Sequence, residues 1–298
     1  MSVQRRSLDG PVAALMVLLC ACWGLQQVAI KLAAPSIGTV LQTGLRSLIA
    51  AVLVGALMLL RRTPFALRDG TLWPGLAAGG LFAAEFLCVA VGLNLTSASR
   101  MVVFLYTAPI FTVLGLHWLV PGERLRIGQW IGIVLAFVGI AVAFASGHDA
   151  SSEHVNGTIW GDLLGVAGAM LWSATTLLIR GSALSEAAPS KTLLYQLGVS
   201  AALILPLAAV SGQFATVNMT SIAWESLLFQ SVIVTFASYL AWFWILRRYL
   251  ASRVSVFSFL TPLFGVAFGM LLLHDVVALR FAVGAVLVLG GIVLVNLR

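Results

Sequence analysis

Residues Ser97–Val113 read SASRMVVFLYTAPIFTV, and residues Leu250–Val266 read LASRVSVFSFLTPLFGV. At an offset of 153 the two stretches share eight identical residues, which are Ala98, Ser99, Arg100, Val103, Phe104, Pro109, Phe111 and Val113 in the first, and Ala251, Ser252, Arg253, Val256, Phe257, Pro262, Phe264 and Val266 in the second. Apolar segments can align by composition alone, but a Ser-Arg pair and a proline at the same spacing are typical of a duplicated unit.

The similarity extends to other parts of both halves. At an offset of 152, the matching residues are Gly132 and Gly139 in the first half and Gly284 and Gly291 in the second. At an offset of 149, they are Trp23, Gln27 and Lys31 in the first half and Trp172, Thr176 and Arg180 in the second. The sequence therefore predicts two related halves.

The composition excludes most classes of soluble protein. Of the 298 residues, 61% are hydrophobic and 9% are charged, whereas an ordinary soluble domain has about 25% charged residues. With a mean hydropathy of +1.06, a water-soluble fold would expose a large apolar surface and would tend to aggregate. We therefore expect the chain to be embedded in lipid.

The apolar runs are long enough for ten membrane crossings, since about 20 helical residues span about 30 Å of hydrocarbon. The runs are residues 11–33, 39–60, 71–93, 97–119, 126–145, 158–180, 190–210, 222–247, 251–273 and 279–297. Five crossings per half is an odd number, so the second half must be inverted relative to the first. We predict an all-α membrane protein with two inverted five-helix repeats, residues 1–147 and 158–298, joined by a polar extracytoplasmic linker at residues 148–157. Inverted repeats are typical of secondary transporters.

The basic residues predict the orientation of these helices. The net charge is +7, and with an intracellular N-terminus 13 of the 17 Lys and Arg residues would lie at cytoplasmic ends, namely Arg5, Arg6, Arg61, Arg62, Arg68, Arg124, Arg126, Arg180, Lys191, Arg247, Arg248, Arg253 and Arg298. Cytoplasmic loops carry such an excess. Both termini are therefore expected in the cytoplasm, and the location expected is the bacterial inner membrane.

Several functional classes lack support in the sequence. There is no phosphate-binding Gly-x4-Gly-Lys-Ser/Thr loop for ATP, no Gly-x-Ser-x-Gly elbow and no paired histidines for a metal. The basic residues form no stripe typical of nucleic-acid binding. Cys20, Cys22 and Cys88 lie in apolar runs and are expected to be buried thiols. We therefore expect no enzyme activity, no cofactor, no metal, no nucleic-acid partner and no ATPase subunit, and a chain that works as a monomer among membrane lipids.

Several short motifs resemble the EamA-type ten-helix exporters of the drug/metabolite transporter superfamily. They are YTAPIF at residues 106–111, GERL at 122–125, QWIG at 129–132, WG at 23–24 and LTPLF at 260–264. The second half departs from the family pattern, because His274-Asp275 stands where Gly-Glu is expected. Overall the chain is most similar to exporters of the YddG type, which move aromatic and other neutral amino acids.

The resemblance implies export of a small molecule through a central cavity between the two halves. For this chain we expect small neutral amphipathic substrates, in the first place aromatic and other neutral amino acids. A carrier for drugs or toxic compounds with the same fold is the alternative, and a channel is a more distant one. Saturable flux and counterflow distinguish a carrier from a channel.

Polar and aromatic residues within the apolar runs are candidates for the cavity lining, because they are costly in lipid unless they face a cavity or one another. Trp23 and Gln27 share a helical face, and Trp172 and Thr176 repeat this stripe in the second half. Further candidates are Gln42, Arg46, Glu85, Tyr106, Tyr195, Gln196, Tyr239 and Trp242. Tyr239 and Trp242 would equally suit an interfacial belt.

The charged candidates and the prolines allow sharper hypotheses. Arg46 lies about 10 Å from the outer end of its helix, so it could face the cavity or reach the surface. Glu85 lies about 12 Å from the nearer end of its helix, too far for a short side chain to reach water. It would bind a substrate ammonium group, carry a proton, or stay neutral and hydrogen-bonded inside the bundle. Pro109 and Pro262, at matched depths, are expected to form hinges or kinks.

Overall fold

The computed structural model describes residues 10–63, 66, 68–119, 126–145, 155–248 and 260–296. In this part of the chain every regular element is helical, which confirms the predicted all-α fold. The elements are α1 (Gly10–Ala33), α2 (Thr39–Leu60), α3 (Leu72–Gly92), α4 (Ala98–Leu105), α5 (Ala108–Leu119), α6 (Ile127–Ala145), α7 (Val155–Arg180), the 3-10 turn η2 (Ala183–Ser185), α8 (Pro189–Val210), α9 (Ser221–Leu228), the π-helix η3 (Phe229–Ser238), α10 (Tyr239–Arg248), α12 (Leu260–Leu272) and α13 (Leu279–Asn296).

Six helical segments in the described part are long and apolar enough to cross a membrane. They are Gly10–Ala33, Thr39–Leu60, Leu72–Gly92, Thr158–Arg180, Pro189–Val210 and Ser221–Trp242. Shorter apolar helices cover Ala98–Thr112, Ile127–Ala143, Leu260–Leu272 and Leu279–Leu294. The chain is thus a multi-pass membrane protein. Most of the predicted linker, residues 148–154, and residues 251–259 of the ninth predicted crossing lie outside the described residues.

Two of the apolar segments are not continuous α-helices. The first is interrupted between Leu105, the end of α4, and Ala108, the start of α5. Pro109 is the second residue of α5, where its missing N–H removes no helical hydrogen bond. Pro262 is the third described residue of α12. Whether either proline acts as a hinge stays a prediction.

The second irregular segment is η3, which joins α9 to α10. Its π-helical backbone leaves room for the Thr235 hydroxyl to donate to the carbonyl of Gln230, five residues earlier, at 2.8 Å. π-helical segments inside α-helices are frequent at functional sites. This one places Gln230 and Ser238, both buried, against α2 and α1.

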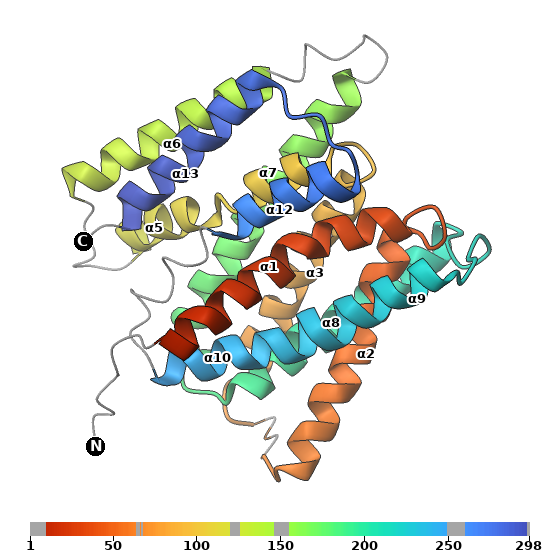
Figure 1. Ribbon diagram of the computed structural model, residues 1–298. Coiled ribbons are helices and arrows are strands. Elements are labelled where there is room, and N and C mark those ends of the chain that lie inside the picture. The colour runs from red at the N-terminus through yellow and green to blue at the C-terminus, as the bar shows by residue number, and fades with distance from the viewer. Residues whose placement is uncertain are drawn as a thin grey trace.

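The most extensive helix contacts join the first half of the chain to the second. Helix α6 packs along α13 (Figure 1), and α2 packs against α8. Three further pairs of contacts are related by exchange of the two halves. They are α1 with α12 and α5 with α7, α3 with α8 and α2 with η3, and α3 with α7 and α1 with η3. This pattern is typical of a pseudo-twofold arrangement of two related halves.

Glycines at repeat-related positions let α6 and α13 approach closely. A Cβ atom added to Gly139 would lie 2.7 Å from the carbonyl oxygen of Gly284, and one added to Gly291 would lie 2.5 Å from that of Gly132. The obstacle in both cases is backbone, which cannot move aside as a side chain can. The two repeats therefore meet here through reciprocal glycine contacts.

A Gly291→Ala substitution is expected to lower the melting temperature of the purified protein in detergent, because overpacking typically costs about 1–3 kcal/mol. The adjacent Gly290 is the matched control, since a Cβ atom there would lie 3.7 Å from Leu135 Cδ2, an ordinary contact. Gly290→Ala should leave the melting temperature unchanged or raise it through better helix propensity. Equal melting temperatures of Gly291→Ala and Gly290→Ala would contradict the close approach of α6 and α13.

Candidate functional site

A buried arginine and a buried glutamate lie near the centre of the bundle. Arg46 on α2 has no exposed surface, and its guanidinium carbon lies 3.9 Å from the centroid of the Phe86 ring on α3. None of the three guanidinium nitrogens of Arg46 has a hydrogen-bond partner. Glu85, the neighbour of Phe86 on α3, is 5% exposed and close enough to Arg46 to interact electrostatically.

Two tyrosines complete this charged centre. Tyr239, the first residue of α10, interacts electrostatically with both Arg46 and Glu85. Tyr106, in the interruption between α4 and α5, interacts with Glu85 and Tyr239. Four of the predicted lining residues, from both halves of the chain, are therefore linked by electrostatic interactions. We refer to Arg46, Glu85, Tyr106 and Tyr239 as the charged centre.

Two edge-to-face aromatic pairs are formed by residues that were predicted to line the cavity. The rings of Tyr106 and Trp172 on α7 meet edge to face, with centroids 5.3 Å apart. Trp23 on α1 and Trp242 on α10 do the same at 5.6 Å. The indole nitrogen of Trp23 also donates to Ser238 Oγ on η3 at 2.8 Å. Each pair joins one half to the other, as edge-to-face aromatic contacts do in protein cores.

The predicted lining residue Gln42 instead belongs to a hydrogen-bonded network. Its Nε2 atom donates to the carbonyls of Ile30 and Ile37, at 3.1 and 2.8 Å, and its Oε1 atom accepts from Gln230 Nε2 at 2.9 Å. Gln230 also donates to Ser226 Oγ at 2.9 Å. Gln42 is thus satisfied on both sides of its amide, and its network joins α1, α2 and η3.

The other predicted lining residues have separate surroundings. The Tyr195 hydroxyl lies 3.4 Å from Oγ1 of Thr71, the residue just before α3. Gln196 is 7% exposed. Thr176 donates its hydroxyl to the carbonyl of Trp172 at 3.0 Å, a common arrangement of threonine within a helix. On α1, Gln27 is buried and its Oε1 atom has no hydrogen-bond partner.

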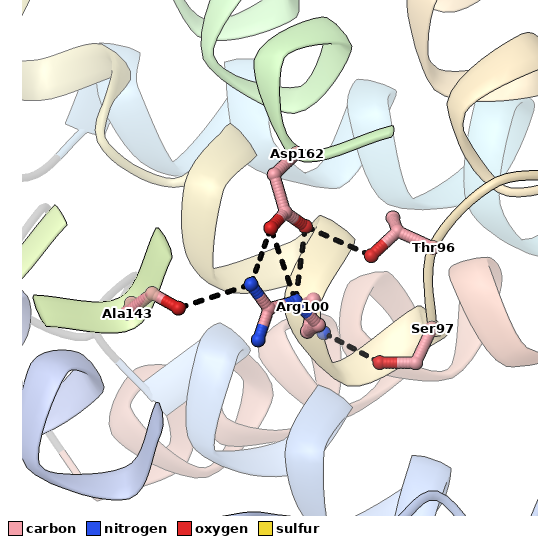
Figure 2. Close-up of polar contacts among 5 residues, drawn as sticks. All are labelled: Thr96, Ser97, Arg100, Ala143 and Asp162. Atoms are coloured by element: carbon pink, nitrogen blue, oxygen red, sulfur yellow. Dashed lines mark hydrogen bonds and ion pairs between the residues drawn. The ribbon is translucent and has the colours of Figure 1, made fainter. Parts of the chain in front are cut away.

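A buried ion pair lies at the end of the bundle where α4 and α7 begin. Figure 2 shows the Arg100 guanidinium against the carboxylate of Asp162, with Nε 3.1 Å from each carboxylate oxygen. Arg100 also donates to the carbonyl of Ala143, and Asp162 accepts from the Thr96 hydroxyl at 2.8 Å. These contacts tie α4 and α6 of the first half to α7 of the second.

Asp275, at the position where the chain departs from the family pattern, also has a clear structural contact. Its carboxylate accepts from the backbone N–H and the hydroxyl of Ser99, at 3.0 and 2.8 Å. It thereby caps free N–H groups in the first turn of α4. The acid that the second half retains connects the segment between α12 and α13 to the first half.

A second ion pair lies at the opposite end, where Asp69 is outside the candidate membrane spans and Lys191 is near the start of one. Lys191 Nζ on α8 lies 2.5 Å from Asp69 Oδ2 in the segment before α3, and Asp69 also accepts from the Thr71 hydroxyl at 2.6 Å. The hydrogen bonds from Lys191 and Thr71 lower the pKa of Asp69 from 3.8 to about 2. The carboxylate is therefore favoured in the folded state.

The low pKa of Asp69 predicts a stability contribution that depends on pH. Since folding lowers this pKa, the contribution is present above the unfolded value and is lost as the pH falls toward about 2. Replacing Asp69 by Asn should lower the melting temperature by a constant amount between about pH 7 and pH 5, and by a shrinking amount below about pH 4. A difference from wild type that grows below pH 4 would contradict this assignment.

The sequence analysis missed three residues of the site. Phe86 supports the Arg46 guanidinium, Gln230 anchors the amide network, and Asp162 pairs with Arg100. Gln230 and Asp162 are polar residues within predicted crossings, so the criterion that selected Glu85 would have found them. Phe86 gave no such signal, because one phenylalanine among many apolar residues does not indicate a contact with a cation.

The chain is similar to known proteins along most of its length. The sequence matches the EamA-like transporter family over residues 11–145 and 159–297. It is 26% identical to the "Uncharacterized transporter YvbV" of Bacillus subtilis, with 96% of this chain and 92% of that protein aligned. It is 28% identical to proteins of Salmonella typhimurium and Escherichia coli, each described as a "Probable amino-acid metabolite efflux pump", with 95% of this chain and 93% of each relative aligned.

A solved protein structure also has a similar fold. It superposes with a TM-score of 0.66 over 95% of each chain, at 18% sequence identity. At this identity the superposition shows a shared fold and carries no information about the substrate. The matched family segments leave residues 146–158 between them, close to the midpoint of the chain.

Proposed function

Because this chain belongs to the EamA-like transporter family, we propose that it exports small neutral amphipathic metabolites, in the first place aromatic and other neutral amino acids, across the bacterial inner membrane. The family makes it a transporter rather than an enzyme. The observation that carries the substrate proposal is the charged centre, which combines a buried arginine and a buried carboxyl group with the edge-to-face pair of Tyr106 and Trp172. A zwitterion with an apolar side chain matches both features.

We propose ten membrane crossings in two inverted repeats, residues 1–147 and 158–298, with both termini in the cytoplasm. Pairs of helix contacts that are related by exchange of the two halves support this arrangement. The reciprocal glycine contacts of α6 and α13 support it as well. The distribution of basic residues supports the orientation, since it would place the Arg100–Asp162 pair at the outer end and the Lys191–Asp69 pair at the inner end.

Transport would proceed by alternating access at the charged centre. Inverted repeats can exchange conformations, so a site between them opens to either side in turn. The charged centre and its aromatic pairs draw on α1, α2, α3, α7, α10 and the α4–α5 interruption, so relative movement of the halves would change its exposure. Pro109, beside that interruption, is the proposed hinge in the first half, and Pro262 is its counterpart.

Counterflow in proteoliposomes tests this function. Purified protein is reconstituted with unlabelled phenylalanine inside, and uptake of labelled aromatic, aliphatic, acidic and basic amino acids is measured with and without an imposed pH difference. We expect saturable counterflow that is fastest for aromatic and other neutral amino acids and absent from protein-free liposomes. Equal uptake across the panel together with transport of a cationic dye such as ethidium would favour the drug carrier instead. Flux without saturation or counterflow would favour a channel.

A further inference from the structure

Arg46 differs from the other buried or half-buried cations of the described residues in having no acceptor. Arg100 pairs with Asp162, Lys191 pairs with Asp69, and Lys31 donates to the carbonyl of Thr96. Arg46 is more deeply buried than Arg100, yet its Nε, Nη1 and Nη2 atoms have no hydrogen-bond partner. The sequence left open whether this side chain reaches the surface, and its complete burial shows that it does not.

A guanidinium group in this position is suited to bind an anion. Its five N–H donors lie in one plane, and two of them can bind a carboxylate in parallel. The Phe86 ring at 3.9 Å stabilises the cation through its face and leaves the N–H edges of the guanidinium for a ligand. Leaving these donors unpaired in a buried site is costly, so an anionic ligand would bind with a strong preference.

Glu85 provides the complementary charge at a matched depth. Arg46 and Glu85 both lie about 10 Å along their helices from the end where α2 begins and α3 ends. These two helix ends are adjacent, because Asn94 Nδ2 donates to Thr39 Oγ1 at 3.0 Å. The described residues contain no ion pair within contact distance between Arg46 and Glu85. A ligand can therefore contact each charge separately.

We propose that Arg46 is the carboxylate anchor of the transported solute, and that it restricts the substrates to α-amino acids and related carboxylates. This inference rests on the proposed function and adds the group that the site recognises. The ammonium of the amino acid would lie toward Glu85, so its two charges would complement the two buried charges with no change in net charge. An amine without a carboxylate would leave Arg46 unpaired and would add a positive charge to the buried site, which is strongly disfavoured at low dielectric.

Competition between matched ligands tests the proposal. Three unlabelled compounds are tested as competitors of labelled phenylalanine in counterflow. They are phenylalanine, phenethylamine, which lacks the carboxylate, and 3-phenylpropionate, which lacks the ammonium. In the wild type, phenylalanine should compete about 10- to 100-fold more strongly than phenethylamine, the range expected for a charge-assisted hydrogen bond. In Arg46→Gln the ratio of the competition strength of phenylalanine to that of phenethylamine should approach one, because phenylalanine binds more weakly. Arg46→Lys, which keeps the charge but loses the planar fork, should give an intermediate ratio.

Controls separate the possible outcomes. Arg61→Gln removes an exposed positive charge just beyond α2 and should keep the wild-type ratio. Melting temperature and size-exclusion profiles show whether each variant folds. If Arg46→Gln does not fold, the comparison of Arg46→Lys with the wild type decides the test. A wild-type ratio near one, or a wild-type ratio retained in folded Arg46→Gln or Arg46→Lys, would overturn the carboxylate anchor while leaving an amino-acid carrier intact. Failure of the wild type to transport any amino acid would instead overturn the proposed function.

Discussion

Replacing Glu85 by Gln is expected to reduce phenylalanine counterflow about 10- to 100-fold, the loss that follows when a charge-assisted hydrogen bond to the substrate ammonium is replaced by a neutral one. The substitution keeps the size and shape of the side chain, so the helix packing around α3 should be preserved. Glu186→Gln is the matched control, because Glu186 lies exposed just after η2. Both variants are compared with wild type in the same proteoliposomes, at saturating and at low phenylalanine concentrations.

The same variant separates the two roles proposed for Glu85. If Glu85 binds the ammonium, phenylalanine should compete more weakly in Glu85→Gln than in the wild type. The difference in competition strength between phenylalanine and 3-phenylpropionate should then be smaller. If Glu85 carries a proton, counterflow should persist while stimulation by an imposed pH difference is lost. A folded Glu85→Gln protein with unchanged rate, ligand preference and pH dependence would contradict both roles.

Replacing Asp162 by Leu is expected to destabilise the protein by about 3–5 kcal/mol, because it leaves the Arg100 guanidinium buried without its carboxylate. The Asp162 side chain has no exposed surface and that of Arg100 is 12% exposed, so water cannot replace the lost partner fully. Thermal unfolding in detergent, followed by the loss of monodisperse protein, measures the change. The melting temperature of this variant should be far below that of wild type.

A double variant shows how much of this loss comes from the unpaired charge. Arg100→Met combined with Asp162→Leu removes both charges, and buried ion pairs can often be replaced by apolar residues without loss of stability. We expect the double variant to melt well above Asp162→Leu alone. If it melts at or below the single variant, the pair stabilises the bundle by its specific geometry, and the unpaired charge does not explain the loss.

The sequence predicted the helices more accurately than their contacts. The predicted crossing at 39–60 coincides with α2, and the one at 158–180 differs from α7 only at its start. Apolar runs of helical length, bounded by charged and polar turns, depend on neighbouring residues alone and can be located from the sequence. The π-helix η3 was not predicted, and two of its residues, Gln230 and Ser238, make hydrogen bonds to other helices that the sequence does not reveal.

The site was predicted in part for the same reason. Glu85 and Arg46 were selected because a charge within an apolar run is exceptional, and both side chains are buried in the structure. Depth along a helix does not reveal which way a side chain faces. Gln42 and Arg46 share one face of α2, yet Gln42 is bound into an amide network while Arg46 lies over Phe86. Tyr195, another predicted lining residue, lies near Thr71 instead.

The three cysteines illustrate the same limit. All were expected to be buried because they lie in apolar runs, but only Cys20 is fully buried, while Cys22 and Cys88 are partly exposed at the surface of the described structure. The helices that carry them have lipid-facing sides, which an apolar run does not distinguish from the protein interior. A labelling experiment on introduced cysteines therefore requires all three to be replaced first.

Sided labelling of two repeat-related alanines tests the inverted repeat most directly. Ala66, before α3, and Ala215, before α9, correspond at the offset of 149 that relates Trp23 to Trp172, and both are exposed. In a variant without native cysteines, Ala66→Cys and Ala215→Cys are treated in intact cells with a membrane-impermeant maleimide, and again after permeabilisation. We predict that Ala215→Cys is labelled in intact cells and Ala66→Cys only after permeabilisation. Labelling of both from the same side would show that the two halves have the same orientation and would contradict the inverted repeat.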